Sequence, residues 1–157
     1  MAAWCGVFLA DLLLRRRELP AAIEVVRAFP QARFILDHAA KPPIASGFDA
    51  EWATRIAELA ACPDVWCKVS GLVTEADWQG WTVDHLRPAV HHVRRVFGED
   101  RLMFGSDWPV CLLAADYRAV KAAAEACLAP LSADARTKIF GANAAHAYAL
   151  SFGDDRC

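Results

Sequence analysis

The chain has 157 residues, 56% of them hydrophobic, which is enough to bury the core of one ordinary domain and excludes extended disorder. Its 17 lysines and arginines nearly balance its 19 aspartates and glutamates, so a strong general attraction to nucleic acid or to an acidic membrane surface is also excluded. We therefore expect a small molecule as the partner, with no nucleic acid and no membrane.

The cysteines and the first residues bear on location. The six cysteines show neither zinc-ribbon nor disulfide-framework spacing, so we expect reduced thiols and a cytoplasmic protein. The apolar start, Met1 to Leu14, is interrupted by Asp11, and its positive charges follow it, which is the reverse of a signal peptide. A membrane span would need roughly 20 apolar residues. We interpret Gly6 to Leu14 as a buried strand.

Strands and helices are predicted to alternate along the chain. Apolar spacing, capping residues and terminating Pro or Gly predict strands over 6–14, 33–38, 65–71 and from 101 onward, and helices over 21–29, 49–61, 82–97, 114–128 and 132–150. The long connection over 72–81 lacks periodicity, and the tail over 151–157 is expected to be frayed. No linker or repeat divides the chain, so 1–157 is predicted to be a single domain.

The strands are continuous apolar runs, which favours a parallel sheet covered by helices on both faces. The predicted fold class is therefore α/β, with about four parallel strands. In such folds the chemistry lies at the carboxyl ends of the strands.

Polar residues stand at or near three of these strand ends. Because side chains alternate along a strand, His38, Lys68, Ser70 and Asp107 are expected to converge. Asp107 could act as a general base toward water while His38 polarises a carbonyl oxygen or binds a metal. Lys41 or Lys68 could hold an anionic group.

Structural interpretations of the same residues stay open. A single buried histidine is more often a hydrogen-bonded core residue than a ligand, and Lys68 can instead neutralise a carboxylate inside the fold. Ser106 lacks the G-x-S-x-G context of a nucleophile, so a serine hydrolase is rejected. The glycine motifs that bind nucleotide phosphates are absent from the sequence.

Four segments occur in a fixed order and together carry a family resemblance: Leu36 to Pro43, Lys68 to Leu72, Arg101 to Pro109, and Ile139 to Ala144. With them, the chain from about Cys5 to Leu150 resembles the amidohydrolase-related (amidohydrolase 2) family. Within that family it is similar to the sugar-lactonase branch, which includes fuconolactone, rhamnonolactone and pyrone-dicarboxylate lactone hydrolases.

The resemblance implies a (β/α)8 barrel with His38 and Asp107 at its mouth. In the family, the residue matching Asp107 takes a proton from the attacking water, and the residue matching His38 contributes to a metal site or, in metal-free members, polarises the lactone carbonyl. The implied cofactor is one divalent metal, zinc or manganese, or none. The residues expected to bind substrate are Lys41, Lys68, Ser70 and Trp108.

One departure from the family pattern is an absence. Members open with an H-x-H motif on the first strand, and Met1 to Leu14 contains no histidine. The first strand is then expected to match a middle strand, and the chain to be a truncated, C-terminal part of the barrel. His38 and Asp107 would supply two metal ligands, whereas a catalytic zinc usually takes three from the protein.

Such a partial barrel has consequences for function. It would leave two strand edges unpaired and an apolar inner face in water, which favours self-association. The leading hypothesis is hydrolysis of a sugar lactone or similar cyclic ester by water that Asp107 activates. The alternative is a catalytically inactive half-barrel fragment or an assembly or pseudoenzyme domain. Amide or decarboxylation chemistry on the same scaffold also stays open.

Overall fold

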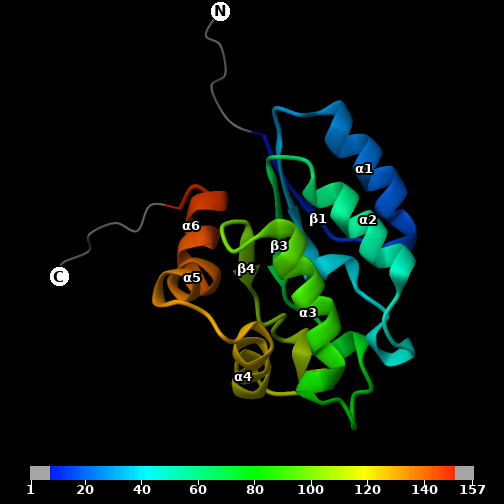
Figure 1. Cartoon of the computed structure of the whole chain (residues 1–157), viewed down its shortest axis with the longest axis vertical. Coiled ribbons are helices and arrows are strands. Elements are labelled where there is room, and N and C mark those ends of the chain that lie inside the picture. Colours follow the sequence, from blue (N-terminus) through cyan, green and yellow to red (C-terminus); the bar gives the residue numbers. More distant parts are fainter. Residues whose placement is uncertain (1–7, 151–157) are drawn as a thin grey trace, which may run out of the picture.

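Four parallel strands form the centre of the computed structural model, which describes residues 8–150 (Figure 1). The strands lie side by side in chain order as β1 Leu9–Leu12, β2 Arg33–Leu36, β3 Val65–Val69 and β4 Leu102–Phe104. Each pairs in parallel register with the next, so their carboxyl ends meet along one rim of the sheet. The predicted α/β class with four parallel strands is confirmed.

The helices follow the predicted order with small shifts at their ends. They are α1 Leu19–Ala28, α2 Ala50–Ala60, α3 Val83–Phe97, α4 Tyr117–Leu128, α5 Ala133–Thr137 and α6 Asn143–Ala147, with a π-helical segment, Lys138–Ala142, joining the last two. Short 3-10 turns cover Arg16–Glu18, Asp37–Ala40, Ile44–Ser46, Val73–Glu75 and Val110–Leu113.

Side-chain caps explain where several helices begin. Helix α2 is capped by Asp49, whose carboxylate accepts a hydrogen bond from the Trp52 amide at 2.9 Å. Helix α4 begins later than predicted, since Asp116 caps it and accepts from the Ala119 amide at 2.8 Å. The predicted helix over 132–150 ends earlier, at Ala147.

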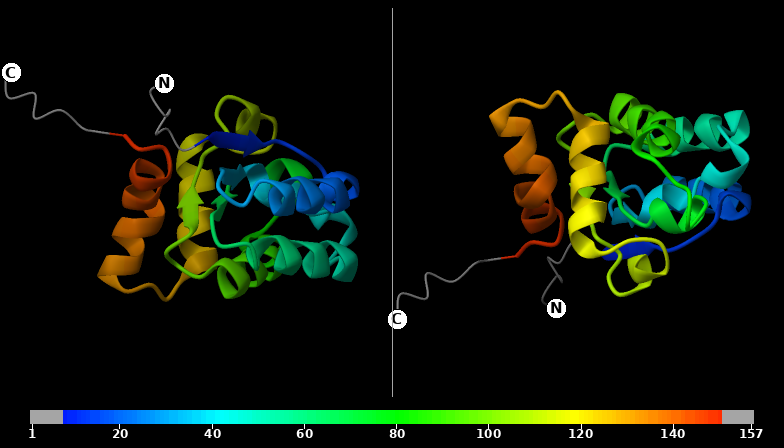
Figure 2. Two further views of the ribbon diagram at one scale, coloured as in Figure 1. Left: turned by 90° about the horizontal axis from the view of Figure 1, so that it is seen from above. Right: turned by 90° about the horizontal axis from the view of Figure 1, so that it is seen from below.

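Helices cover the two faces of the sheet unequally. On one face, buried strand residues such as Leu36, Cys67 and Leu102 pack against the apolar sides of α1 to α4. On the other face, Ile35, Trp66 and Met103 are buried by α6. Figure 2 shows α1 and α2 on one side of the sheet and the α5–α6 run on the other.

The expectation of an apolar inner face in water is therefore wrong for these three residues. The physical reason is the anchoring of the last helical run near the amino ends of two strands. Arg33 donates hydrogen bonds to the carbonyls of His146 at 3.3 Å and Ala147 at 3.2 Å. Within the described sheet, β1 and β4 each pair with a single neighbour, so both edges are unpaired there.

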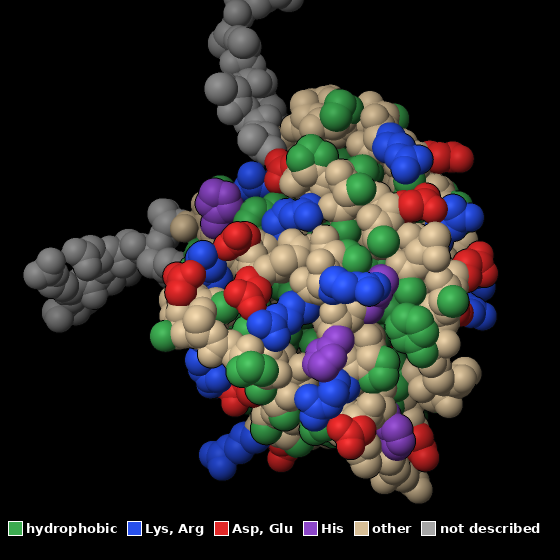
Figure 3. Space-filling view, viewed as in Figure 1, with side chains coloured by type: hydrophobic (Ala, Val, Ile, Leu, Met, Phe, Trp, Pro, Cys, Tyr) green, Lys and Arg blue, Asp and Glu red, His purple; other side chains and the backbone are tan. Residues whose placement is uncertain are grey.

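Some expectations fall outside the described residues. The first part of the predicted strand over 6–14, up to residue 7, and the frayed tail over 151–157 cannot be compared with the structure. Across residues 8–150, every helix is too short or too polar to cross a bilayer. Figure 3 shows cationic and anionic side chains interspersed over one face, as the balanced charge suggests.

Candidate active site

The turn after β2 has an unusual backbone conformation. His38, Ala39, Ala40 and Lys41 have φ angles of 52°, 48°, 56° and 53°, all in the left-handed region. Each such residue costs roughly 1–2 kcal/mol without glycine. The turn is closed by the Lys41 amide, which donates to the His38 carbonyl at 2.8 Å. Backbone strain of this kind is concentrated at functional sites in proteins.

This turn corrects the alternation argument for His38. The strand ends at Leu36, so the period of two no longer applies when the chain reaches His38. The left-handed turn instead carries the imidazole to the carboxyl rim of the sheet. Asp107 likewise lies beyond the end of β4, at Phe104, and has a φ of 58°.

Three of the predicted residues meet at this rim. His38 Nδ1 lies 2.8 Å from Ser70 Oγ, directly after β3, and His38 Nε2 lies 3.5 Å from Asp107 Oδ1. The three side chains come from the ends of three adjacent strands, which parallel pairing brings together. The predicted convergence therefore occurs for His38, Ser70 and Asp107.

Gly71 completes this arrangement and was missed from the sequence. It has a φ of 61°, and a Cβ atom built on it would lie 2.7 Å from His38 Nδ1 and 3.1 Å from Asp107 Oδ2. A side chain there would collide with the imidazole. The available signal was its place directly after a strand end, next to Ser70.

Burial sets the charge state of the site. Burial lowers the pKa of His38, and the nearby carboxylates of Asp107 and Asp37 oppose that effect without reversing it. The imidazole is therefore neutral at neutral pH. Asp107 Oδ2 is buried and has no hydrogen-bond partner among the described residues. An unpaired carboxylate oxygen of this kind is suited to accept a proton or to bind a cation.

Lys68 does not join this group. Its Nζ lies 2.6 Å from Asp37 Oδ1 and 3.3 Å from Asp11 Oδ1. Burial acts to lower the pKa of Lys68, but hydrogen bonds to Asp37 and Tyr148 outweigh burial and raise it. The lysine therefore stays charged and links β3 to β1 and to the turn after β2, as the structural interpretation anticipated.

Lys41 lies near His38, and both side chains face an open hollow. Lys41 Nζ is 3.1 Å from Glu75 Oε1, and its side chain lines a hollow of about 500 Å³ together with His38 and Asp107. The wall is completed by Leu13, Leu14, Arg15, Arg17, Glu18 and Val110. Trp108, next to Asp107, is 65% exposed.

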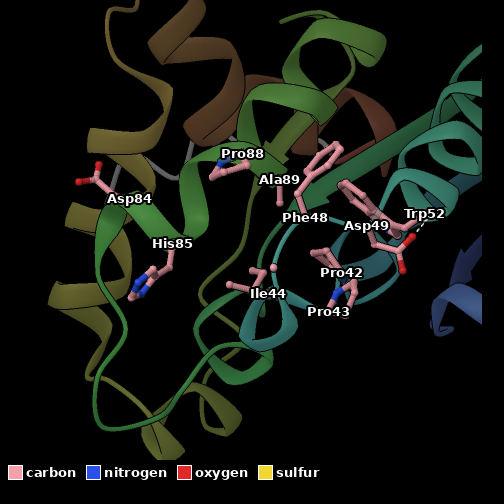
Figure 4. Close-up of a pocket in the computed structure, with 11 residues that line it drawn as sticks. Pro42, Pro43, Ile44, Phe48, Asp49, Trp52, Asp84, His85, Pro88 and Ala89 are labelled. Carbon is pink, nitrogen blue, oxygen red and sulfur yellow. Dashed lines mark hydrogen bonds between the residues drawn. The ribbon is translucent and has the colours of Figure 1, made fainter.

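A second pocket, of about 200 Å³, lies between α2, α3 and the segment after Lys41 (Figure 4). Trp52, Phe48, His85 and Pro88 line it, and none of the predicted site residues does. This pocket lies among α2, α3 and the segment after Lys41, away from His38 and Asp107, so we do not assign the chemistry to it.

A metal ion would find two donors at the rim, His38 Nε2 and an Asp107 carboxylate oxygen. Over residues 8–150, no group of three or more His, Cys, Asp or Glu side chains is placed to hold a metal. The described residues therefore fit only part of a catalytic metal site, which usually takes three protein ligands.

The fold and this rim define the class of protein. A model of the amidohydrolase family (Amidohydro_2) matches residues 2–150, so the chain belongs to that family. The chain is 48% identical over 146 residues to an L-fucono-1,5-lactonase of Burkholderia ambifaria, covering 89% of this chain and 49% of that protein. It is 42% identical over 154 residues to an L-fucono-1,5-lactonase of Burkholderia multivorans, covering 91% of this chain and 52% of that protein.

A solved structure gives the same result for the fold. A crystal structure of an amidohydrolase from Burkholderia multivorans with bound zinc superimposes with a TM-score of 0.87 at 42% identity, covering 91% of this chain and 53% of that one. The chain thus spans about half the length of the relatives that it matches.

Proposed function

We propose that the rim site hydrolyses a sugar lactone or a similar cyclic ester. The observation that carries the proposal is the buried, unpaired Asp107 oxygen beside a neutral His38 on the wall of an open hollow. The similarity to proteins named L-fucono-1,5-lactonase supports the choice of substrate class.

In this reaction Asp107 takes a proton from a water molecule, whose oxygen attacks the lactone carbonyl carbon. The ring carbon–oxygen bond then breaks, and the leaving ring oxygen takes up the proton that Asp107 accepted, so the product is an open-chain hydroxy acid and Asp107 is again a carboxylate. His38 Nε2 carries a hydrogen when it polarises the carbonyl oxygen, and in that tautomer Nδ1 accepts a hydrogen bond from Ser70.

Ser70 is compatible with either role of His38. If His38 Nε2 instead binds a cation, Nδ1 carries the hydrogen and donates it to the Ser70 hydroxyl, because a hydroxyl both donates and accepts. One divalent ion, zinc or manganese, could be held by His38 and Asp107 together with further donors. When bound, it would polarise the lactone carbonyl.

Among the remaining candidates, we assign the substrate's anionic or hydroxyl groups to Lys41 rather than Lys68. Lys41 shares the hollow with His38 and Asp107 and pairs with one carboxylate, Glu75, whereas Lys68 does not line the hollow and pairs with two, Asp37 and Asp11. Trp108 is proposed as an exposed wall for the sugar ring.

The test is hydrolysis of a panel of sugar lactones by the purified chain, with and without zinc or manganese. Asp107→Asn keeps the shape of the side chain and removes the base, so we expect turnover to be lost while the circular dichroism spectrum is unchanged. Turnover retained in Asp107→Asn would remove Asp107 from the role of base. A folded wild-type chain without turnover would favour the alternative, a catalytically inactive half-barrel fragment or an assembly or pseudoenzyme domain.

Two further proposals concern the assembly of the protein and its location in the cell. We propose self-association through the unpaired edges of β1 and β4, which present open backbone groups in the described sheet. We also propose a cytoplasmic location, supported by the cysteines within residues 8–150, which are reduced: Cys62, Cys67, Cys111 and Cys127.

A further inference from the structure

The left-handed turn that carries His38 needs an external support. Four successive residues without glycine hold positive φ angles, and the backbone hydrogen bond from Lys41 to His38 that closes the turn is a weak compensation. Strained turns persist only where the surrounding structure holds them. A side chain packed against residues 38–41 can supply part of that support.

One buried side chain makes such a contact. The indole nitrogen Nε1 of Trp52, on α2, donates a hydrogen bond to the Ala39 carbonyl at 2.9 Å. Trp52 is 1% exposed and Ala39 is 1% exposed, so water cannot replace this bond. In the left-handed conformation of the turn, the carbonyl of Ala39 points toward Trp52.

The indole is itself held in place. The Trp52 amide donates to Asp49, the cap of α2, so the first turn of the helix is fixed. The Trp52 ring packs against Phe48 with 6.4 Å between ring centroids and against His92 with 5.4 Å. The ring therefore acts as a rigid donor that cannot follow the turn if the turn relaxes.

We propose that Trp52 is a positioning residue for His38, which acts by fixing the Ala39 carbonyl and with it the left-handed turn. This inference rests on the proposed function, in which His38 supports hydrolysis. Trp52 lines the second pocket, which Figure 4 shows, and does not line the hollow that contains His38 and Asp107. Its effect on chemistry must therefore pass through the backbone of the turn.

The turn can be observed directly, without any activity. Ala40–Lys41 is the one Ala–Lys pair in the sequence, so labelling alanine carbonyls with 13C and lysine amides with 15N isolates the Lys41 amide in an NMR spectrum. This amide closes the turn onto the His38 carbonyl. In Trp52→Phe, which removes the donor and keeps an aromatic ring, we expect its signal to shift and its solvent exchange to become about tenfold faster.

Two further variants separate positioning from packing. Trp66→Phe removes another buried indole, one that bonds to Asp64 on the opposite face, and should leave the Lys41 amide unchanged. Adding Ala39→Gly to Trp52→Phe should restore the wild-type signal and exchange rate, because glycine adopts a positive φ at little cost. It should not restore the melting temperature, since the volume lost from the indole remains.

The outcomes are distinct. An unchanged Lys41 amide in a folded Trp52→Phe variant would overturn the proposal, and so would failure of Ala39→Gly to restore it. If the wild-type chain hydrolyses a lactone, Trp52→Phe should lower kcat about tenfold with KM unchanged, and Ala39→Gly should recover kcat. If no form of the chain has turnover, the proposed function fails while the NMR result still decides the role of Trp52.

Discussion

Gly71 determines how closely the end of β3 can approach the imidazole of His38. Its hydrogen atom leaves space that any larger side chain would take from the ring, because an added Cβ would lie within 2.8 Å of two ring atoms, Nδ1 and Cγ. Real Cβ atoms do not approach other atoms so closely, so either the turn or the ring must move. Displacements of about 1 Å at a reacting centre cost roughly 100-fold in rate.

We therefore predict that Gly71→Ala lowers kcat for lactone hydrolysis about 100-fold. Gly98→Ala is the matched control, because Gly98 has a similar φ of 70° but no atom within 4 Å of an added Cβ. Both variants carry the backbone strain of alanine at positive φ, so both should melt at a lower temperature. Equal activities in the two variants would contradict the proposed contact with His38.

For single residues, the sequence predicted which side chains form the candidate site better than it predicted their positions. The motifs identified His38, Ser70 and Asp107, because polar residues that end buried strands stand out from the apolar pattern. The hydrogen bond from Trp52 to Ala39 could not be predicted, since the left-handed turn depends on tertiary contacts. Lys68 was predicted to converge with these three residues. Its carboxylate partners, Asp11 and Asp37, come from other segments, and the sequence does not show that they lie beside it.

Among the elements, the helical run from α5 through α6 depends most clearly on one side chain for its position on the sheet. Asn143, at the first position of α6, donates hydrogen bonds from Nδ2 to the carbonyls of Glu99 at 2.8 Å and Leu102 at 2.6 Å. This amide fixes the helical run to the start of β4. Helix α6 can then bury Ile35, Trp66 and Met103.

We predict that Asn143→Ala destabilises the chain by about 2 kcal/mol, since it leaves buried carbonyl groups without a donor. Urea unfolding followed by tryptophan fluorescence measures the change. Gln79→Ala, at an exposed position of the loop before α3, is the control and should change stability by less than about 0.5 kcal/mol. A loss for Asn143→Ala no larger than the control would mean that apolar packing alone holds α6.

Elements with strong periodicity were predicted well and their ends less well. Helices α2 and α3 begin and end within one residue of the predicted limits, because Asp49 and Gly98 mark a start and an end that the local sequence specifies. The π-helical segment between α5 and α6 was not predicted. Its hydrogen-bonding pattern depends on packing against β4, which a local pattern does not reveal.

For the whole molecule, buried histidines make stability depend on pH. Burial lowers the pKa of His92, and the neighbouring Arg95 adds to this, although a bond to the Ala53 carbonyl opposes it. A histidine with a lowered pKa in the folded state binds protons more weakly there than in the unfolded chain. Its stabilising effect is therefore present above about pH 6.5, the ordinary histidine pKa, and is lost as the pH falls below it.

The melting temperature should accordingly fall between pH 7 and pH 5. In His92→Gln, which keeps an N–H donor for the Ala53 carbonyl but does not titrate, this fall should be smaller, with a remainder due to His38. Thermal scans of both proteins at several pH values measure the difference. Parallel curves for the two proteins would exclude His92 as a source of acid sensitivity.

The unpaired strand edges lead to a prediction about assembly. We expect light scattering to give a mass above that of one chain, and Phe8→Lys to lower it, because Phe8 is 65% exposed next to the β1 edge. Phe29→Lys is the control, at a 51% exposed position at the end of α1. A monomeric wild-type chain would contradict self-association.

The separation of the rim from the anchoring of α6 has a consequence for how such a protein can change over generations. His38, Ser70 and Asp107 follow the strands, whereas Arg33 and Asn143 attach the last helical run near the strands' beginnings. Substitutions at exposed positions of the loop over 108–113, such as Val110, which lines the hollow, can alter which molecule is accepted without touching the residues that hold the layers together. Laboratory selection for a new substrate is best confined to these exposed positions, where a change tests selectivity rather than core packing.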